Sequence, residues 1–227
     1  ANAELIADAE DRGLALAIAA RPDASSGTTL VSIHAADHPG LFYRIAGAIS
    51  LGGANILDAR IHTTRDGQAI DNFVVADPLG RPFAETAQLQ RLKRNIEDVL
   101  TGKVRLADRL AARPLARRRA EVFKVEPNII IDNKASNRYT VVEVGAADRP
   151  ALLYALTHAL FQSRVTIHSA HIATYGERAT DTFYITDLTG QKIDSTTRLK
   201  ALERRLVAVA GSANSRIEAL EQQEAAE

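Results

Sequence analysis

The sequence predicts an α+β protein made of two ferredoxin-like units, each a four-stranded antiparallel sheet with two helices on one face. Two observations lead to this prediction. The chain has 227 residues, which is enough for two small domains, and one ordered set of residues occurs in it twice. Within each copy, segments with the two-residue period of strands alternate with segments that have the 3.6-residue period of helices.

The repeat is clearest around the start of the first predicted helix in each copy. Residues 37–43 read DHPGLFY, and residues 148–154 read DRPALLY. The matches continue downstream and, after a slip of one residue, include Asp71 with Asp181 and Phe73 with Phe183. The slip falls at a predicted hairpin, where a deletion is best tolerated. Two unrelated α/β domains would not share so many residues in the same order.

The first copy contains the elements of a ββαββα unit. A proline early in a turn opens its first helix, which ends at Gly52-Gly53, and Asp66-Gly67 is a strong hairpin signal. The expected strands lie at residues 14–20, 28–35, 57–63 and 73–76, and the expected helices begin at Leu41 and near residue 85. The second copy repeats the pattern, with strands near 122–131, 138–146, 165–175 and 179–187 and helices near 151–163 and 195–210.

These elements divide the chain into five parts. We expect an incoming helix at residues 1–13, the first unit at 14–102, a basic linker at 103–120, the second unit at 121–211 and a C-terminal tail at 212–227. The linker carries arginines at positions 105, 109, 113 and 117, interrupted by Pro114. A solvated linker and a contact with an acidic surface both remain open. The chain starts with alanine and contains no methionine, so we expect it to be part of a longer polypeptide.

The composition argues against several classes of protein. The 28 basic and 28 acidic residues balance, so no net charge attracts nucleic acid or an anionic membrane. The absence of cysteine excludes disulfides and thiolate metal sites and fits a cytoplasmic location. No apolar run is long enough to span a bilayer. No histidine cluster with metal-ligand spacing, nucleotide-binding motif or catalytic triad stands out, so we expect no catalytic residue, metal or cofactor in this chain.

The best candidate for a binding site is the turn before the first helix of each copy. Asp37 to Leu41 place backbone N–H groups at a helix N-terminus, which is suited to a carboxylate. Gly40 would allow close approach of a ligand to the backbone, and Asn55 offers a donor and an acceptor. An α-amino acid needs this combination, with Asp37 as an acceptor for its ammonium group. The alternative is that Asp37 only caps the helix and Gly40 only turns the chain.

These motifs resemble ACT domains, which are amino-acid-binding regulatory modules attached to metabolic enzymes. The resemblance rests on DHPGLF at residues 37–42, an amphipathic helix, and GANI at residues 53–56. Residues 77–83 (DPLGRPF), 131–133 (IDN) and 169–177 (SAHIATYGE) are more specific. They resemble the C-terminal ACT pair of the family of bifunctional uridylyltransferase/uridylyl-removing enzymes, which modify the nitrogen-signalling protein PII. The resemblance covers about residues 14–211.

The resemblance implies a glutamine sensor that regulates catalytic domains elsewhere in a parent enzyme, which would use Mg²⁺. Motif positions carried over from the family line the first site with Asp37, His38, Pro39, Gly40, Leu41 and Asn55. They line the second site with Asp148, Arg149, Pro150, Leu152 and Thr166. Ala151 stands where the first copy has glycine, and Thr166 where it has asparagine. We therefore expect the first unit to be the better site.

Two other functions remain open. The chain could be a stand-alone ACT-repeat module for interaction or dimerisation without a ligand, and a homodimer through the ACT sheets is one form of it. It could also bind RNA, as other ferredoxin-like domains do, but aromatic residues are only 5% of the chain and the net charge is 0. We expect no nucleic-acid partner and no membrane partner.

Overall fold

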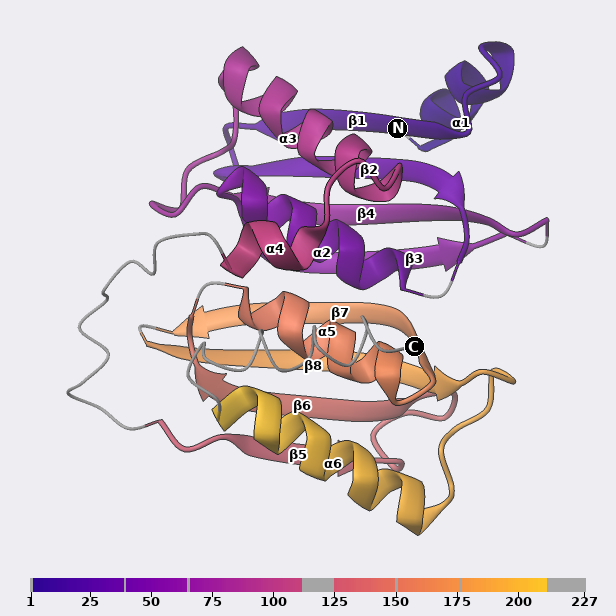
Figure 1. Cartoon of the computed structure of the whole chain (residues 1–227), viewed down its shortest axis with the longest axis vertical. Coiled ribbons are helices and arrows are strands. Elements are labelled where there is room, and N and C mark those ends of the chain that lie inside the picture. Colours follow the sequence, from indigo (N-terminus) through magenta and orange to yellow (C-terminus); the bar gives the residue numbers. More distant parts are fainter. Residues whose placement is uncertain are drawn as a thin grey trace.

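Two halves of the chain build two halves of one antiparallel sheet. The computed structural model describes residues 2–38, 40–64, 66–111, 125–149, 151–175 and 177–211. Within these residues, eight strands form a sheet in the order β1-β2-β4-β3-β7-β8-β6-β5 (Figure 1). Every neighbouring pair is antiparallel. The predicted fold of two four-stranded ferredoxin-like units is confirmed.

Each unit has the element order ββαββα, as the periodicity predicts. The strands are β1 (Leu16–Asp23), β2 (Thr28–Ala36), β3 (Asn55–Thr63), β4 (Gln68–Ala76), β5 (Asn128–Asp132), β6 (Thr140–Ala147), β7 (Val165–Tyr175) and β8 (Arg178–Asp187). The helices are α1 (Asn2–Asp11), α2 (Leu41–Gly52), α3 (Thr86–Leu100), α4 (Leu106–Ala111), α5 (Leu152–Gln162) and α6 (Thr196–Gly211).

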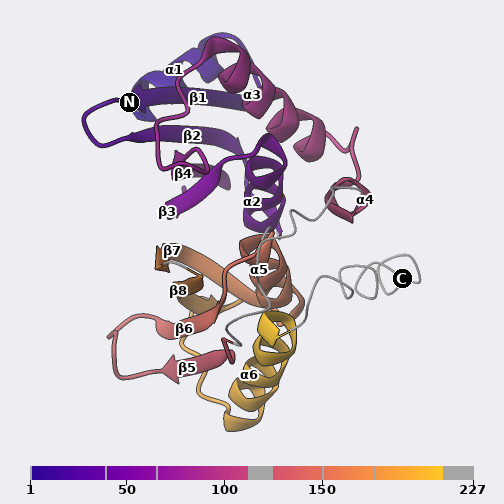
Figure 2. The ribbon, with the colours of Figure 1, turned by 90° about the vertical axis from the view of Figure 1, so that its left-hand side faces the viewer.

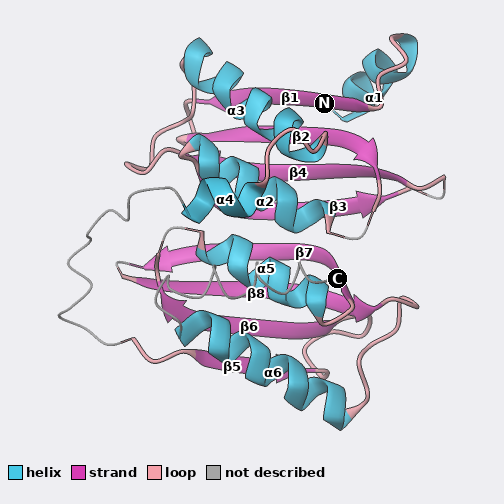
Figure 3. Ribbon diagram, viewed as in Figure 1, coloured by secondary structure: helices cyan, strands magenta, loops and turns pink. Residues whose placement is uncertain are grey.

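The helices α2, α3, α5 and α6 cover one face of the sheet, as Figures 2 and 3 show. This side holds the main hydrophobic core, because the inward residues of the strands meet the apolar faces of these helices. Phe73 on β4 and Phe183 on β8, which are repeat partners, are each 0% exposed. Both sit in the middle strands of their units and anchor the core at equivalent places.

The first helix packs on the opposite face. Leu5 and Ala9 of α1 cluster with Ala17, and Ala19 packs against them. These two alanines alternate along β1 with Leu16, Ile18 and Ala20, which pack against the main core. Since successive side chains of a strand point to opposite faces, α1 covers the side of β1 that the other helices leave open.

The two units meet along β3 and β7 and between α2 and α5. Three residue pairs join the strands: Asp58 with His171, Ala59 with Ala170, and Arg60 with Ser169. The pairing is antiparallel, so the two units are related approximately by a twofold rotation about the junction. The two units therefore join through one edge strand of each four-stranded sheet.

Four rings fill the junction between the helices. The Tyr43 ring of α2 lies 4.9 Å from the His158 ring, 5.2 Å from the Phe161 ring and 6.0 Å from the Tyr154 ring, all of α5, measured between centroids. Tilted and edge-on arrangements at these distances are favourable for aromatic side chains. The cluster places Tyr43, three residues after Gly40 of the first candidate site, next to the second unit.

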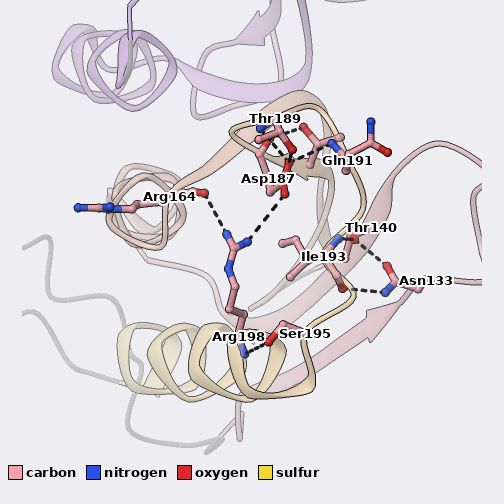
Figure 4. Close-up of polar contacts among 10 residues, drawn as sticks. Asn133, Thr140, Arg164, Asp187, Thr189, Gln191, Ile193, Ser195 and Arg198 are labelled. Atoms are coloured by element: carbon pink, nitrogen blue, oxygen red, sulfur yellow. Dashed lines mark hydrogen bonds and ion pairs between the residues drawn. The ribbon is translucent and has the colours of Figure 1, made fainter.

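The loop after the last strand of each unit is held by an aspartate. Asp187 accepts hydrogen bonds from the backbone N–H groups of Thr189 (2.8 Å) and Gln191 (3.0 Å) (Figure 4). Its repeat partner Asp77 accepts from Leu79 and Arg81, both at 2.8 Å. These loops lead to α6 and α3, so the same local device orients the second helix of both units.

Parts of the expected linker and tail lie outside the described residues. The linker prediction covers residues 103–120, of which α4 occupies 106–111. Arg113, Pro114 and Arg117 and the predicted tail at 212–227 lie outside the described residues. Arg105 and Arg109 are described, and the Arg109 N–H donates to the Arg105 carbonyl at 3.3 Å.

Candidate ligand sites at two helix N-termini

The first candidate site is the turn between β2 and α2. Gly40 is the N-cap of α2 and has a left-handed backbone, with φ 88° and ψ 0°. The Asp37 carboxylate accepts a hydrogen bond from the Thr63 hydroxyl at 3.0 Å, and the Asp37 N–H donates to the Gly67 carbonyl at 2.8 Å. Asp37 therefore faces the β3–β4 hairpin and is not the N-cap, in contrast to the simple capping interpretation.

The second candidate site has the same backbone plan. Ala151 is the N-cap of α5, with φ 59° and ψ 17°. The Asp148 N–H donates to the Glu177 carbonyl of the β7–β8 hairpin at 2.8 Å. Arg149 turns away toward α6, where its Nη2 atom donates to the Val209 carbonyl at 3.0 Å. Arg149 therefore contacts the end of α6. Its predicted role was to line the second ligand site.

Both helices begin without a side-chain cap among the described residues. The first backbone N–H groups of a helix have no carbonyl partner within the helix, and they carry the positive end of its dipole. Leu41 and Leu152 use their N–H groups within the turns, to the carbonyls of His38 and Arg149. The next N–H groups of each helix are the ones suited to a carboxylate.

Not every predicted residue presents its side chain at these turns. Leu41 and Leu152 are each 4% exposed and belong to the hydrophobic core, so their side chains cannot line an open site. Pro39 and Pro150 lie outside the described residues. His38 lies in the first turn and is partly exposed.

The sequence suggested that Gly40 would let a ligand approach the backbone closely. In the structure, the space beside Gly40 is occupied. A Cβ atom placed there would overlap the Tyr43 ring, whose Cδ1 atom would lie 3.2 Å away. The missing side chain of Gly40 therefore makes room for the aromatic cluster between α2 and α5. The glycine serves both the left-handed turn and the packing of Tyr43.

Asn55 and Thr166 are exposed but do not lie beside the turns of their own units. Asn55 begins β3 after α2 has ended, and twelve helical residues span about 18 Å. Because β3 and β7 run antiparallel, Asn55 lies toward the end of β7, at the same end of the sheet as the second turn (Figure 1). By the same geometry, Thr166 lies at the end that carries the first turn. This differs from the predicted assignment of each residue to its own unit.

One buried carboxyl group lies beside each turn and was not among the residues predicted from the sequence. Asp71 on β4 is 1% exposed, and Asp181 on β8 is 2% exposed. Burial raises the pKa of Asp71 to about 7, and the nearby charge of Asp37 adds to this shift. Burial raises the pKa of Asp181 to about 7 as well, with Asp148 in the role of Asp37. An aspartate two residues from an inward phenylalanine of a strand was the signal that could have revealed them.

The described residues contain no group of three or more His, Cys, Asp or Glu side chains that could hold a metal ion. Among the same residues, the structure has no helix long and apolar enough to cross a membrane.

The chain is similar to enzymes that are named bifunctional uridylyltransferase/uridylyl-removing enzyme. It is 64% identical over 184 residues to the enzyme of Novosphingobium aromaticivorans, covering 81% of this chain and 20% of the enzyme. It is 54% identical over 191 residues to that of Erythrobacter litoralis (84% and 21%). It is 50% identical over 214 residues to that of Zymomonas mobilis (94% and 23%). The chain thus spans about a fifth of the length of these relatives.

Other comparisons add little. No family model matches the chain. Among solved structures, it is similar to a protein described as a glycine cleavage system transcriptional repressor (14% identity, 80% of this chain and 91% of that chain, TM-score 0.28). At so low a TM-score, the fold assignment rests on the strand order and helix placement. The sequence identities carry the relationship: this chain is similar to about one fifth of the length of the bifunctional uridylyltransferase/uridylyl-removing enzymes.

Proposed function

We propose that this chain is the amino-acid-sensing region of a bifunctional enzyme that adds uridylyl groups to the PII protein and removes them. The proposed ligand is glutamine, and the proposed location is the cytoplasm. The chain binds the ligand and does not catalyse, and the reactions belong to catalytic domains of the parent enzyme, which uses Mg²⁺. The two candidate sites lie at the two turns, one at each end of the central junction.

One observation carries this proposal: the same turn at a helix N-terminus occurs twice, with no side-chain cap from the described residues, in a chain similar to these enzymes. Backbone N–H groups at a helix start favour the carboxylate of an amino acid. Asp37, which is exposed, and Asp148, which is half-buried, lie beside these turns and suit its ammonium group. Together the two features match the two charges of a zwitterion.

The placement of Asn55 and Thr166 extends each site across the junction. The antiparallel pairing of β3 with β7 supports a second site made of the second turn and Asn55, and a first site made of the first turn and Thr166. A ligand that contacts both units would favour one arrangement of the units over another. Such coupling is typically about 1–3 kcal/mol, which would be the signal passed to catalytic domains.

Calorimetric titration of the 227-residue chain with L-glutamine tests the proposal, with D-glutamine as the matched control. We expect saturable heat and a rise in melting temperature with the L-isomer, since a ligand at 100 times its Kd stabilises the folded state by about 2.7 kcal/mol. Absence of both effects at millimolar L-glutamine contradicts glutamine sensing.

Two variants test the composition of the sites. Asn55→Ala removes an amide at the end of the sheet that carries the second turn, and Thr166→Ala removes a hydroxyl at the other end. We expect each substitution to weaken one of two binding events, and Asn55→Ala to alter NMR signals of bound ligand near residues 148–152 rather than 37–41. The opposite pattern assigns each residue to its own unit.

A ligand-free interaction module is the second candidate function. The observation that favours it is the Tyr43 ring, which occupies the space beside Gly40 and packs on α5. A rigid pair of units would then present its outer strands, β1 and β5, for pairing with another copy. Analytical ultracentrifugation with and without L-glutamine separates the candidates, since this module forms a dimer whose mass does not depend on the ligand.

A further inference from the structure

We propose that the buried carboxyl groups of Asp71 and Asp181 are the receptors for the ammonium group of the ligand, one in each unit. This inference rests on the proposed function and names the charge that the sites select. A ligand ammonium would sit between Asp71 and Asp37 in the first unit and between Asp181 and Asp148 in the second.

The buried carboxyl group of Asp71 lies on β4, a middle strand of the first unit. In the described part of the chain, neither Asp71 carboxyl oxygen makes a hydrogen bond, and both are shielded from solvent. Its neighbours in register, Ile33 on β2 and Ile61 on β3, are both apolar. Burying a carboxyl group without a partner is costly, and such a cost is commonly retained at functional sites.

Asp71 lies beneath the first turn. Asp71 shares the helix side of β4 with Phe73, because alternate residues of a strand point to one face. Asp37, at the end of β2, is the charged group that acts on Asp71. Thr63 lies next to Ile61 on the same face of β3 and donates to the Asp37 carboxylate at 3.0 Å. The turn thus holds one carboxylate at its surface and a second one below it.

Two nearby carboxyl groups favour a cation between them. Without a cation between the two groups, burial and then the charge of Asp37 favour the protonated form of Asp71 and raise its pKa to about 7. An ammonium group supplies one positive charge and three hydrogen-bond donors, which is what two carboxyl groups lack. The N–H groups at the start of α2 lie on the same side of the sheet and suit the carboxylate of the same ligand.

The repeat supplies an independent observation. Asp181 occupies the matching position on β8, between Val144 on β6 and Ile172 on β7. Its Oδ1 atom is buried and makes no hydrogen bond among the described residues, and Asp148 is the charged group that acts on it. The turns differ at Gly40 and Ala151, yet the pair of carboxyl groups is the same. A packing accident would not recur in this way.

The test compares L-glutamine with 4-carbamoylbutanoate, which is the same molecule without the α-ammonium group. Calorimetry uses the full chain and the variants Asp71→Asn, Asp181→Asn and the double variant. Asp98→Asn removes a carboxyl group on α3 whose side chain is 41% exposed and lies 3.8 Å from Lys103 Nζ, and it is the matched control. We expect the unaltered chain to prefer L-glutamine at least tenfold, each single variant to lose one binding event, and the double variant to show no preference.

The outcomes separate the two proposals. If the unaltered chain binds neither compound, glutamine sensing itself fails, and the receptor assignment fails with it. If it binds both compounds equally, or if the double variant keeps the preference for L-glutamine, the receptor assignment is wrong while glutamine sensing stands. Circular dichroism of each variant confirms folding, and the two-ligand comparison on the unaltered chain decides the question even if a variant unfolds.

Discussion

The two units solve the same backbone problem with different residues. The first unit places Gly40 (φ 88°) before α2 and Gly53 (φ 85°) after it. At the matching points the second unit uses Ala151 (φ 59°) and Arg164 (φ 54°), which are the non-glycine residues with positive φ among the described residues. The left-handed conformation costs a non-glycine residue roughly 1–2 kcal/mol. The second unit therefore tolerates strain at both ends of its first helix that the first unit avoids.

The comparison also shows what is kept when these residues change. Both units retain the buried aspartate on the last strand, a second aspartate in the turn, and a tyrosine three residues after the N-cap. Tyr43 lies over Gly40, whereas Tyr154 stacks on His158 at 5.9 Å with an interplanar angle of 5°. The charged pairs are thus repeated, while the packing around the turns has diverged.

The largest expected effect tests whether the buried carboxyl groups are equivalent. Their folded pKa values near 7 lie above the unfolded value of 3.8, so the folded chain holds more protons between these limits. The free energy of unfolding should fall as pH rises from about 4 to about 7 and then level off, by up to about 4 kcal/mol for each carboxyl group.

Urea denaturation at several pH values measures this effect. Asp71→Asn and Asp181→Asn should each remove part of the pH dependence, and the double variant should remove most of it, while Asp98→Asn leaves it unchanged. If only one single variant flattens the profile, the two units differ in their carboxyl groups as well as in their turns.

The next effect concerns the turn before each helix. Gly40→Ala forces a Cβ atom against the Tyr43 ring and places alanine in the left-handed region, so we expect a loss of about 2–3 kcal/mol of stability. Ala151→Gly relieves strain and should stabilise the chain by about 0.5–1 kcal/mol. Thermal unfolding of both variants measures the difference. A Gly40→Ala variant as stable as the unaltered chain would show that Tyr43 moves aside easily.

A smaller effect is expected at the ends of the same helices. Gly53 donates its N–H to the carbonyls of Ile49 and Ser50 as the C-cap of α2, and Gly53→Ala should cost about 1 kcal/mol. Arg164→Gly keeps the N–H bond to the Phe161 carbonyl (2.9 Å) and should stabilise the second unit by up to about 1 kcal/mol. Unfolding in urea checks both signs. Equal destabilisation by both variants would mean that the Arg164 side chain makes a necessary contact.

These differences also mark what the sequence could reveal. The repeat, the Asp66-Gly67 hairpin and the periods of strands and helices predicted the order of the elements along each unit, because these signals are local. The union of β3 with β7 is not local, and their sequences do not specify the register. Likewise, the isolation of Asp71 depends on Ile33 and Ile61, whose positions beside it follow only from the pairing of three strands.

The smallest effect tests the boundary between the units. Asp58 Oδ1 lies 3.5 Å from His171 Nδ1 across the β3–β7 pairing, and the His171 side chain is 68% exposed. Exposed ion pairs contribute little, whereas the rings around Tyr43 pack closely. We expect Asp58→Asn and His171→Gln, combined in a double-mutant cycle, to give a coupling energy below about 0.5 kcal/mol. A coupling above about 1 kcal/mol would mean that the ion pair helps to hold the two units together, and the twofold arrangement would then respond to the charge on His171.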